Sequence, residues 1–575
     1  MSDPSFLKEL LDDAIKAHQS GALKEAEDLY YLILNRDPHY VDALILLGML
    51  YAQTGRDEDA EFYLKHAVRV KPDAWRGFHY LGMVYTHQRK VDLAIAAFEK
   101  ALALNPDTPE IYNHYGNLFR SQDNYPEAIR YYERAIELRF DYQDAYNNLG
   151  STFLRQKNIE KAKETFQKSL TFNDDNVEAH HYLGILAYEE DQLEKALFHF
   201  QKILMKQPNK IEALINLAAT HLKQGHHDIA KDLFQKVLKQ EPFQKEALGN
   251  IAAVELILKN HEAAKKYYLD LLTVDPQNYS AHFNLGVIYM GMRRWEDAAF
   301  HYEMALSIQP EDADAHSNYA TTLIKQGQEA LAMMHYEKAL SLQPKNPILL
   351  YRLASLKQQG GFKVTPKEYV MNLFDHYADY FDKDVVESLA YQVPKMIHER
   401  LLKRNKHPYD VLIDLGCGTG LCGELLKPLT HHLIGVDLSS KMLDVAEEKE
   451  IYDALYDKDV IEYLNEQKEK VSVLVAADVF CYFGDLQEVF RACYGVLDEK
   501  GCLIFTVEEL FEMTPGEEPS YRLEKTGRFS HHVDYLIQSL RQVGFQSVEC
   551  TAVVLRQQKE KNVMGLLVVA EVETV

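Results

Sequence analysis

The sequence predicts a long α-helical solenoid followed by an α/β domain built on a mostly parallel sheet. Three observations carry this prediction. A 34-residue period runs through residues 7–346, strand–helix alternation replaces it after Gly360 and Gly361, and the first strand of that second region enters a glycine-rich turn. A fixed period of this length is typical of stacked helical hairpins, and strand–helix alternation is typical of a parallel sheet with helices on both faces. The two regions are therefore expected to fold by different rules.

The overall charge excludes some classes of function. The chain of 575 residues has 63 Lys and Arg against 87 Asp and Glu, which gives a formal net charge of −24. Binding to nucleic acid or to an anionic membrane needs clustered Lys and Arg, so neither is expected. Hydrophobic residues make up 47% of the chain, which excludes disorder as the main state.

The ends and the cysteines indicate a compartment. No apolar run reaches the roughly 20 residues needed to cross a bilayer, and the first residues, MSDPSFLKELLDD, lack the pattern of a secretory signal. All six cysteines lie between Cys417 and Cys550 without a C-x-x-C pair. We therefore expect reduced thiols, no metal site and a cytoplasmic protein.

The period in the first region shows in several independent ladders of residues. A proline recurs at 34-residue spacing near the end of most units. A small residue stands at the eighth position of each unit: Gly48, Gly82, Gly116, Gly150, Gly184, Ala218, Ala252, Gly286, Ala320 and, after the last unit, Ala354. A mostly aromatic ladder stands sixteen residues later: Tyr30, Leu64, Phe98, Tyr132, Phe166, Phe200, Phe234, Tyr268, Tyr302 and Tyr336. The small residue predicts close approach of two helices, the aromatic residue is expected to fill space between units, and the proline ends the second helix.

These ladders resemble the tetratricopeptide repeat. The resemblance implies ten units over 7–346, each a pair of helices, and a capping helix and linker over 347–364. A helical hairpin of this kind cannot bury its apolar face alone, so the units are expected to stack. Two units depart from the pattern at the eleventh position, where His221 and Glu255 replace a large apolar residue. These units are expected to pack or curve differently, with His221 as a structural histidine or a ligand contact.

A row of asparagines suggests a function for the repeats. The sixth position carries Asn148, Asn216, Asn250, Asn284 and Asn318. This row is similar to the asparagine ladder of O-linked N-acetylglucosamine transferase, which implies a groove that holds a protein or peptide partner by its backbone. A side-chain amide offers both a donor and an acceptor for that task. Acidic residues at the second position imply a basic partner, although they also suit the first turn of a helix, and asparagine there is also explained as repeat consensus.

The second region alternates strands and helices. After helices over 367–404, strands are expected at the start of 411–420, at 432–437, within 471–480 and at 501–510, with a weaker one before Asp459 and an antiparallel hairpin at the end. The first strand leads into Asp414-Leu-Gly-Cys-Gly-Thr-Gly420. Its glycines fit both G-x-G-x-G and the dinucleotide pattern G-x-G-x-x-G. An acid at Asp414 disfavours a pyrophosphate and suits an ammonium group, and Asp437 at the end of the second strand suits a ribose.

The stretch from Asp414 to Ser439 resembles class I S-adenosylmethionine-dependent methyltransferases, and the likeness extends over 365–575. It implies a Rossmann-like fold with a seven-stranded sheet and a terminal antiparallel hairpin. It also implies S-adenosyl-L-methionine as cofactor, with Asp414 at the methionine end, Asp437 on the ribose and Asp459 at the adenine. The full implied set of cofactor residues is Asp414, Gly416, Gly418, Gly420, Asp437, Leu438, Met442, Asp459 and Val460.

The acceptor side is less well defined by the sequence. Asp478 ends the fourth strand, and Tyr482 and His531 are the other candidate catalytic residues. His531 is singled out as base or orienter because histidine titrates near neutral pH. A helical segment with Tyr377, Tyr380 and Phe381 is expected to cover the cofactor or to pack as core.

The functional hypothesis is a methyltransferase that the repeats target or scaffold. The strand end Ala-Ala-Asp478-Val-Phe lacks the N-P-P-Y pattern of amide-nitrogen methylation, which favours an oxygen or carbon acceptor on a small or lipid-like molecule. Two alternatives stay open at this point. The repeats would deliver a protein substrate, or the methyltransferase fold would be inactive and serve as a scaffold.

Overall fold

The computed structural model describes residues 4–375, 377–378, 381–383, 391–404, 408–511, 520–558 and 561–573. The chain divides into two compact units, Met1–Pro276 and Gln277–Val575, and each is treated by itself below. Within the described ranges, no helix combines the length and the apolar character needed to cross a membrane.

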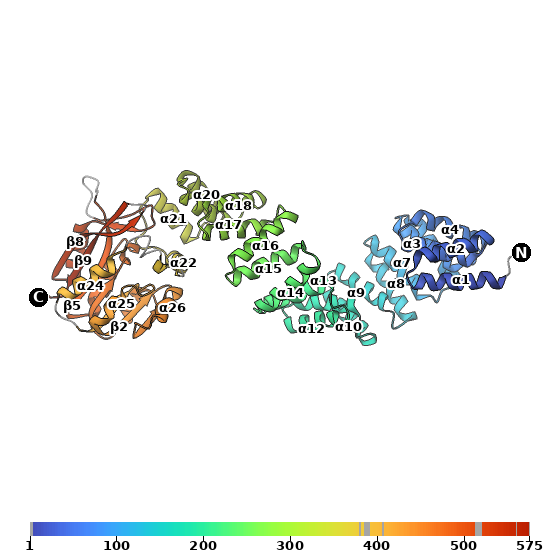
Figure 1. Cartoon of the computed structure of the whole chain (residues 1–575), viewed down its shortest axis with the longest axis horizontal. Coiled ribbons are helices and arrows are strands. Elements are labelled where there is room, and N and C mark those ends of the chain that lie inside the picture. The colour runs from blue at the N-terminus through green and yellow to red at the C-terminus, as the bar shows by residue number, and fades with distance from the viewer. Residues whose placement is uncertain are drawn as a thin grey trace. The chain divides into compact units, whose positions relative to one another are not determined.

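The first unit consists of sixteen helices, drawn from blue to green in Figure 1, which contact one another in consecutive pairs. Each helix is 13 to 16 residues long. Their bounds are α1 Pro4–Gln19, α2 Leu23–Arg36, α3 Val41–Gln53, α4 Asp57–Val70, α5 Trp75–His87, α6 Val91–Leu104, α7 Pro109–Ser121, α8 Tyr125–Leu138, α9 Gln143–Arg155, α10 Ile159–Phe172, α11 Val177–Glu189, α12 Leu193–Lys206, α13 Ile211–Lys223, α14 His227–Gln240, α15 Lys245–Ile257 and α16 His261–Val274.

The small residue of each repeat explains how its two helices pack. A Cβ added at Gly82 would lie 2.6 Å from the Phe98 ring, and one at Gly116 would lie 2.6 Å from the Tyr132 ring. The aromatic residue therefore lies directly on the glycine of its own unit, whereas the sequence predicted that it fills space between units. The glycine and the aromatic ring thus pack against each other within one helical hairpin. The outer faces of the hairpin remain available for stacking on its neighbours.

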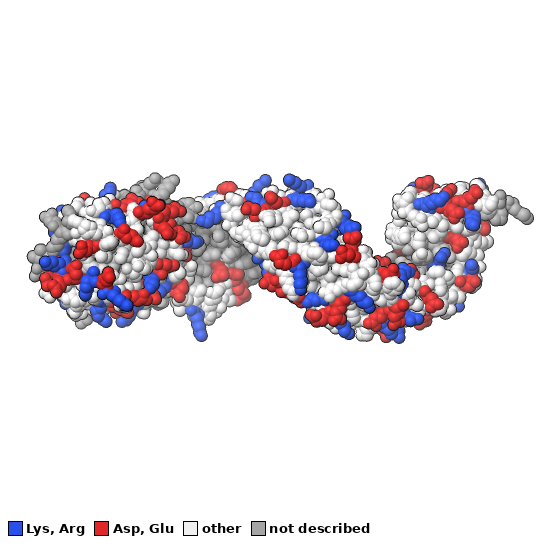
Figure 2. Space-filling view, turned by 90° about the horizontal axis from the view of Figure 1, so that it is seen from below, with Lys and Arg blue, Asp and Glu red and all other residues white. Residues whose placement is uncertain are grey.

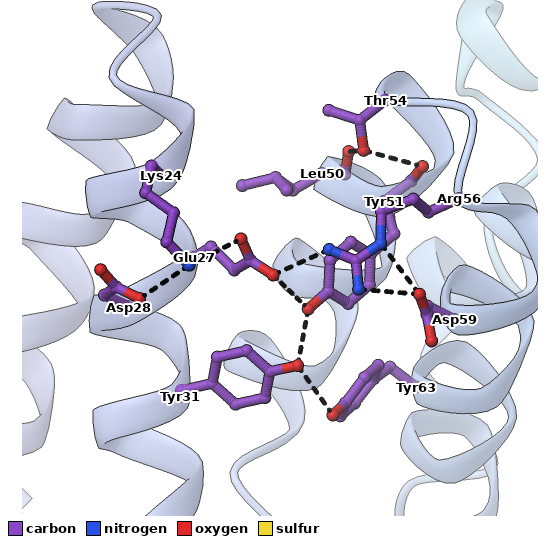
Figure 3. Close-up of polar contacts among 10 residues, drawn as sticks. All are labelled: Lys24, Glu27, Asp28, Tyr31, Leu50, Tyr51, Thr54, Arg56, Asp59 and Tyr63. Atoms are coloured by element: carbon purple, nitrogen blue, oxygen red, sulfur yellow. Dashed lines mark hydrogen bonds and ion pairs between the residues drawn. The ribbon is translucent and has the colours of Figure 1, made fainter.

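A second contact joins neighbouring repeats through position 21 of one unit and position 11 of the next. Figure 3 shows its form near the amino end, where the Tyr51 hydroxyl donates to Glu27 Oε1 at 2.7 Å. Arg56 donates to the same oxygen at 2.9 Å, and its guanidinium lies 4.0 Å from the centre of the Tyr51 ring. The Tyr31 and Tyr51 hydroxyls are 2.7 Å apart, so the carboxylate is held in a network of polar side chains.

The departing residue Glu255 makes the same positional contact with different chemistry. It is only 2% exposed, and its Oε1 lies 2.9 Å from Lys231 Nζ, at position 21 of the preceding unit. Asn260 donates to the other oxygen at 2.8 Å. At position 11, Glu255 stands where the second repeat has Tyr51. At position 21 of the preceding repeat, Lys231 stands where the first repeat has Glu27. Helices α14 and α15 have the same lengths as the corresponding helices elsewhere in the array.

The second unit begins with five more helices of the repeat region. They are α17 Tyr279–Gly291, α18 Trp295–Ile308, α19 Ala313–Lys325, α20 Glu329–Leu342 and α21 Pro347–Lys357. The first four form two helix pairs, and α21 is the capping helix that the sequence predicted. The remaining helices of this unit are α22 Lys367–Asp375, α23 Phe381–Lys383, α24 Val393–Lys403, α25 Gly423–Leu426, α26 Ser440–Glu448, α27 Val460–Glu466, α28 Gln487–Val496 and α29 Val533–Val543.

A twisted sheet forms the core of the second unit (Figure 1). Its strands are β1 Tyr409–Leu415, β2 Thr430–Asp437, β3 Ala454–Asp457, β4 Val471–Ala476, β5 Leu497–Glu509, β6 Tyr521–Leu523, β7 Phe529–His531, β8 Ser547–Gln558 and β9 Lys561–Glu571. The order is β3-β2-β1-β4-β5, parallel throughout, followed by antiparallel β9 and β8. These seven strands match the sequence prediction. Two further strands, β6 and β7, raise the total to nine.

The two additional strands form a short hairpin at the carboxyl end of β5. β7 pairs with β5 through Glu508↔Ser530 and Glu509↔His531, and β6 pairs only with β7. Capping helix α21 packs on the hairpin through an apolar cluster composed of Tyr351, Ala354, Tyr369, Leu523 and Phe529.

Charged side chains are spread over the surface. Figure 2 shows Lys and Arg interspersed with Asp and Glu on the face that it presents. On that face, the excess acidic side chains are spread among basic ones and form no single large acidic patch.

Candidate active site

One cavity of about 280 Å³ lies at the carboxyl ends of β1, β2 and β4. In parallel sheets this edge is where ligands bind, because loops from several strands converge there. The residues that line it include eight of the nine predicted cofactor residues: Asp414, Gly416, Gly418, Asp437, Leu438, Met442, Asp459 and Val460. Gly420 is the exception. A Cβ there would meet Ile451 and Tyr452 at 3.1 Å, so this glycine serves packing behind the loop.

The glycine-rich turn after β1 shapes one wall of the cavity. Gly416 and Gly418 have φ values of +65° and +54°, in the left-handed region that favours glycine. A Cβ on Gly416 would lie 2.3 Å from Val479 Cγ2, whereas one on Gly418 would meet nothing within 4 Å. Gly416 is therefore required for packing, and Gly418 leaves open space in the cavity for a ligand to approach the backbone.

Asp414 presents a buried carboxylate oxygen without a hydrogen-bond partner among the described residues. The side chain is 1% exposed, and Tyr452 donates to its Oδ2 at 2.8 Å while Oδ1 has no partner. Burial raises the pKa of Asp414 to about 7, because a low-dielectric environment disfavours the charged form. A buried acceptor that faces a cavity fits the ammonium end of S-adenosylmethionine.

Asp437 and Asp459 hold backbone groups as well as lining the cavity. Asp437 accepts from the Gly418 N–H and the Ser439 N–H, both at 2.9 Å. Burial raises the pKa of Asp437, while these backbone hydrogen bonds oppose that rise. Asp459 caps α27 by accepting from the Ile461 and Glu462 N–H groups, and its Oδ2 lies 3.4 Å from Lys367 Nζ. Both carboxylates are thus fixed in position beside the glycine turn.

At the other end of the cavity, Asp478 stands in a strained backbone conformation. Its φ is +58°, which is uncommon for a residue other than glycine. Its Oδ2 lies 3.2 Å from an Nη1 atom of both Arg528 and Arg556. Its Oδ1 is buried and has no hydrogen-bond partner among the described residues. Such strain is maintained where surrounding contacts fix one orientation, here that of the carboxylate.

Glu508 completes a four-membered charge cluster. It pairs closely with Arg556 Nη2, and its Oε1 lies 3.5 Å from Arg528 Nη1. Two arginines and two acids neutralise one another at this end of the cavity. Arg528, Arg556 and Asp478 line the cavity, and Glu508 stands behind them.

Aromatic side chains form the rest of this end. Tyr482 is 5% exposed, lies under the Arg528 guanidinium at 5.5 Å, and its hydroxyl has no hydrogen-bond partner among the described residues. Burial raises the pKa of Tyr482 well above its usual value. Tyr377 and Phe381, two of the aromatic residues of the predicted cover, line the cavity, and so does Phe374, which was not predicted. Tyr380, the third aromatic residue of that prediction, lies outside the described residues.

His531 does not reach the cavity. It is fully buried in β7, its Nε2 lies 3.1 Å from the Gly484 carbonyl, and its ring stacks on Tyr535. Burial lowers the pKa of His531 to about 4, so the ring is neutral at neutral pH. The structure therefore brings Asp478 and Tyr482 together at the cavity but leaves His531 in the core behind it.

Several of the lining residues were not predicted from the sequence. Thr365 and Tyr391 come from the segment before the first strand, and Arg556 comes from the last hairpin. The strand pairing of β8 with β9 shifts register between Val554 and Arg556, which makes both Leu555 and Arg556 buried. An arginine within an apolar strand was the available signal, but alternation alone gives no indication of a bulge.

The five predicted groove asparagines are half-buried on the first helices of their repeats. Asn148 is engaged within the array, because its amide donates to Asn113 Oδ1 and its own Oδ1 accepts from Arg120, both at 3.0 Å. In the first unit, Asn216 lines a surface hollow of about 490 Å³ with Glu212, Glu241 and Glu246. The five asparagines lie on the first helices of their repeats: Asn148 on α9, Asn216 on α13, Asn250 on α15, Asn284 on α17 and Asn318 on α19.

Comparison with known families agrees with both halves of the structure. The family model for a methyltransferase domain matches residues 413–505. Models for tetratricopeptide repeats match 17–79, 76–140, 107–175, 187–253, 245–278, 279–312 and 313–346. The chain therefore carries an array of tetratricopeptide repeats followed by a methyltransferase domain.

Curated relatives are similar over parts of the second region. The chain is 42% identical over 64 residues to the 18S rRNA (guanine-N(7))-methyltransferase RID2 of Arabidopsis thaliana, covering 10% of this chain and 22% of that protein. It is 30% identical over 102 residues to the mitochondrial ubiquinone biosynthesis O-methyltransferase of Rattus norvegicus, covering 16% and 30%. It is 28% identical over 120 residues to the probable S-adenosylmethionine-dependent methyltransferase CRG1 of Saccharomyces cerevisiae, covering 20% and 40%.

The chain spans less than half the length of each of these relatives. Among solved structures, it is similar to Pseudomonas aeruginosa PilF, with 25% identity, 37% of this chain and 96% of that chain covered, and a TM-score of 0.33.

Proposed function

We propose that this protein transfers a methyl group from S-adenosylmethionine to a small acceptor bound at the Asp478 end of the cavity. The observation that carries the proposal is the placement of unpartnered, buried polar atoms at the two ends of one cavity. Asp414 Oδ1 marks the cofactor end, and Asp478 Oδ1 and the Tyr482 hydroxyl mark the acceptor end. Each leaves a hydrogen bond unmade, which is costly unless a ligand completes it.

The residues at the cofactor end fit S-adenosylmethionine. Asp414 would receive the ammonium group, Asp437 the ribose hydroxyls, and the open space over Gly418 would accept the chain between them. Leu438, Met442 and Val460 would contact the adenine, with Asp459 near its amino group. When bound, the cofactor supplies an electrophilic methyl group on a sulfonium, whose departure as a thioether needs no proton.

The acceptor end supports a hydroxyl or an acidic carbon rather than a protein side chain. Aromatic side chains line it, and the Asp478 carboxylate, whose buried Oδ1 has no hydrogen-bond partner among the described residues, would accept a proton there. In the proposed step, the acceptor oxygen forms the new bond to carbon while the sulfur–carbon bond breaks, and the acceptor's proton passes to Asp478. The charge cluster keeps Asp478 oriented, and the closed aromatic wall excludes water from the reacting atoms.

The test combines binding and labelling. Calorimetry with S-adenosylhomocysteine should show binding to the wild-type chain, and methyl-labelled S-adenosylmethionine should label the metabolite fraction of a cell lysate. Absence of cofactor binding would overturn the enzymatic proposal and favour a scaffold. Label confined to the protein fraction would overturn the acceptor class and favour a protein methyltransferase.

We further propose that the repeats, over 7–346 with the cap and linker at 347–364, bind a protein partner with a basic segment. The hollow beside Asn216 supports this, because its acids Glu212 and Glu246 occupy the second position of two consecutive units. Asn148 is occupied within the array, which leaves Asn216, Asn250, Asn284 and Asn318 as the candidate backbone contacts. Substituting these four by Ala should weaken partner capture, with Asn148→Ala as the matched control. Identical captured partners would refute the groove.

A further inference from the structure

The β6–β7 hairpin holds one of the arginines of the acceptor end. Its tip is closed by the Gly527 N–H to the Glu524 carbonyl at 2.9 Å and by the Glu524 N–H to the Arg528 carbonyl at 2.8 Å. Arg528 follows the tip directly and extends into the cavity toward Asp478. The position of this guanidinium therefore depends on the position of the hairpin.

The last repeat helices hold this hairpin at three points. The Tyr351 hydroxyl donates to the Gly527 carbonyl at 3.1 Å, and Lys525 Nζ lies 2.7 Å from Glu329 at the start of α20. Gln358 donates to Glu524 at 3.3 Å. The two outer contacts are exposed and contribute little, whereas Tyr351 is fully buried within the apolar cluster under the hairpin.

The same hydroxyl reaches a second wall of the cavity. Because its proton goes to the Gly527 carbonyl, Tyr351 accepts from the Thr365 hydroxyl, at 2.8 Å. Thr365 lines the cavity, and its N–H donates to the Tyr482 carbonyl at 2.9 Å. A single side chain of the capping helix thus contacts Gly527, the residue before Arg528, and Thr365, whose N–H holds the Tyr482 carbonyl.

We propose that Tyr351 is a positioning residue of the methyl-acceptor site, acting through Arg528 and Tyr482. The proposal rests on the function proposed above, since that function makes this end of the cavity the acceptor end. The capping helix of the repeat array is then a structural part of the catalytic unit and more than a tether. Among the described residues, the hydrogen bonds of Tyr351 go to Thr365 and Gly527 and to none of the residues of the cofactor end, so we expect the cofactor affinity to be independent of Tyr351.

The test uses Tyr351→Phe in the full-length chain, which removes the hydroxyl and keeps the ring. We expect amide hydrogen exchange in 521–531 to accelerate at least ten-fold while exchange in β1 and β2 stays unchanged. Labelling of the metabolite fraction should slow at least ten-fold, with affinity for S-adenosylhomocysteine within two-fold of wild type. Tyr132→Phe is the matched control, because it removes another buried hydroxyl, bonded to Asn117 in the first unit, and should change none of these.

A second variant addresses the same hairpin from its other side. A Cβ on Gly527 would lie 2.7 Å from the Tyr369 hydroxyl, and φ at this residue is +76°. Gly527→Ala should therefore displace the tip and reproduce both effects with Tyr351 intact.

Three results would overturn the proposal. These are unchanged exchange in the hairpin of Tyr351→Phe, faster exchange without slower labelling, and an equal loss of cofactor affinity. If the wild-type chain labels nothing, the proposed function fails and the positioning role fails with it, while the exchange measurement still decides whether Tyr351 holds the hairpin.

Discussion

Two buried acids, Glu255 in the repeats and Asp478 at the cavity, show how the same chemistry serves different ends. Both Glu255 oxygens have partners, Lys231 and Asn260, so the charge is neutralised and nothing further can be bound. Asp478 has two arginines on one oxygen, and its other oxygen is buried without a partner among the described residues. A carboxylate with partners on both oxygens supports the fold. A carboxylate with one unpartnered oxygen is available to a ligand.

The largest effect on the rate of methyl transfer is expected when the charge of Asp478 is removed. Asp478→Asn keeps the shape, and asparagine tolerates the left-handed backbone of this position well. Loss of the proton acceptor should slow methyl transfer by about 100-fold or more. Labelling of the metabolite fraction measures this, with cofactor affinity expected to match wild type. The free energy of unfolding should fall, because Arg528 and Arg556 lose one of the two acids that balance them. Asp498→Asn, at the half-buried start of β5 and outside the residues that line the cavity, is the control. A fully active Asp478→Asn would remove the base from the proposed mechanism.

Loss of the Glu255–Lys231 pair should instead lower the free energy of unfolding. Glu255→Ala leaves Lys231 unpaired, and since that side chain is 27% exposed, we expect a loss of about 2–3 kcal/mol, below the range for a fully buried pair. Urea unfolding followed by helical circular dichroism measures the change, and methyl transfer should be unaffected. The double variant Lys231→Glu/Glu255→Tyr recreates the Glu27–Tyr51 contact of the first repeats and should recover most of the loss. If it is less stable than Glu255→Ala, the positional contact is not interchangeable.

Asp437 lies between these two extremes, because both oxygens accept backbone hydrogen bonds while the side chain lines the cavity. Asp437→Ala should weaken binding of S-adenosylhomocysteine about ten-fold, from the loss of roughly 1.5–3 kcal/mol in hydrogen bonds to a charged group. Calorimetry measures it. Asp457→Ala is the matched control, since Asp457 pairs with Asp437 in register on β3 but does not line the cavity. Equal affinities would remove the ribose contact.

A further effect depends on pH and concerns Asp414. The pKa of Asp414 is about 7 in the folded protein, against an ordinary value of 3.8. Between about pH 3.8 and pH 7, the folded protein therefore keeps a proton on this carboxyl that the unfolded chain has lost. This residue therefore contributes stability below that range that is lost as pH rises through it. Binding an ammonium needs the ionised form, so cofactor affinity should rise up to ten-fold per unit between pH 5.5 and 7. Calorimetry on wild type and Asp414→Asn tests this, and an equally steep pH dependence in the variant would exclude Asp414.

The repeats and the cofactor end were predictable from the sequence because their contacts follow local spacing. The helix pairs follow from a fixed period, and Asp414, Gly416 and Asp437 follow from their places after successive strands. The acceptor end was predicted only in part, because it is assembled from segments far apart in the chain. Arg556 depends on a β-bulge, and His531 turns into the core because β7 pairs with β5, which no residue pattern in the segment indicates.

The apolar cluster beneath the β6–β7 hairpin has a practical consequence for shortened forms of the protein. A fragment that starts at residue 365 would lose Tyr351 and Ala354 and would leave Tyr369, Leu523 and Phe529 facing water. A newly exposed patch of rings next to a short strand edge promotes self-association. A fragment that starts at α17 keeps the cluster covered, and should therefore remain monomeric in expression trials where the shorter one precipitates.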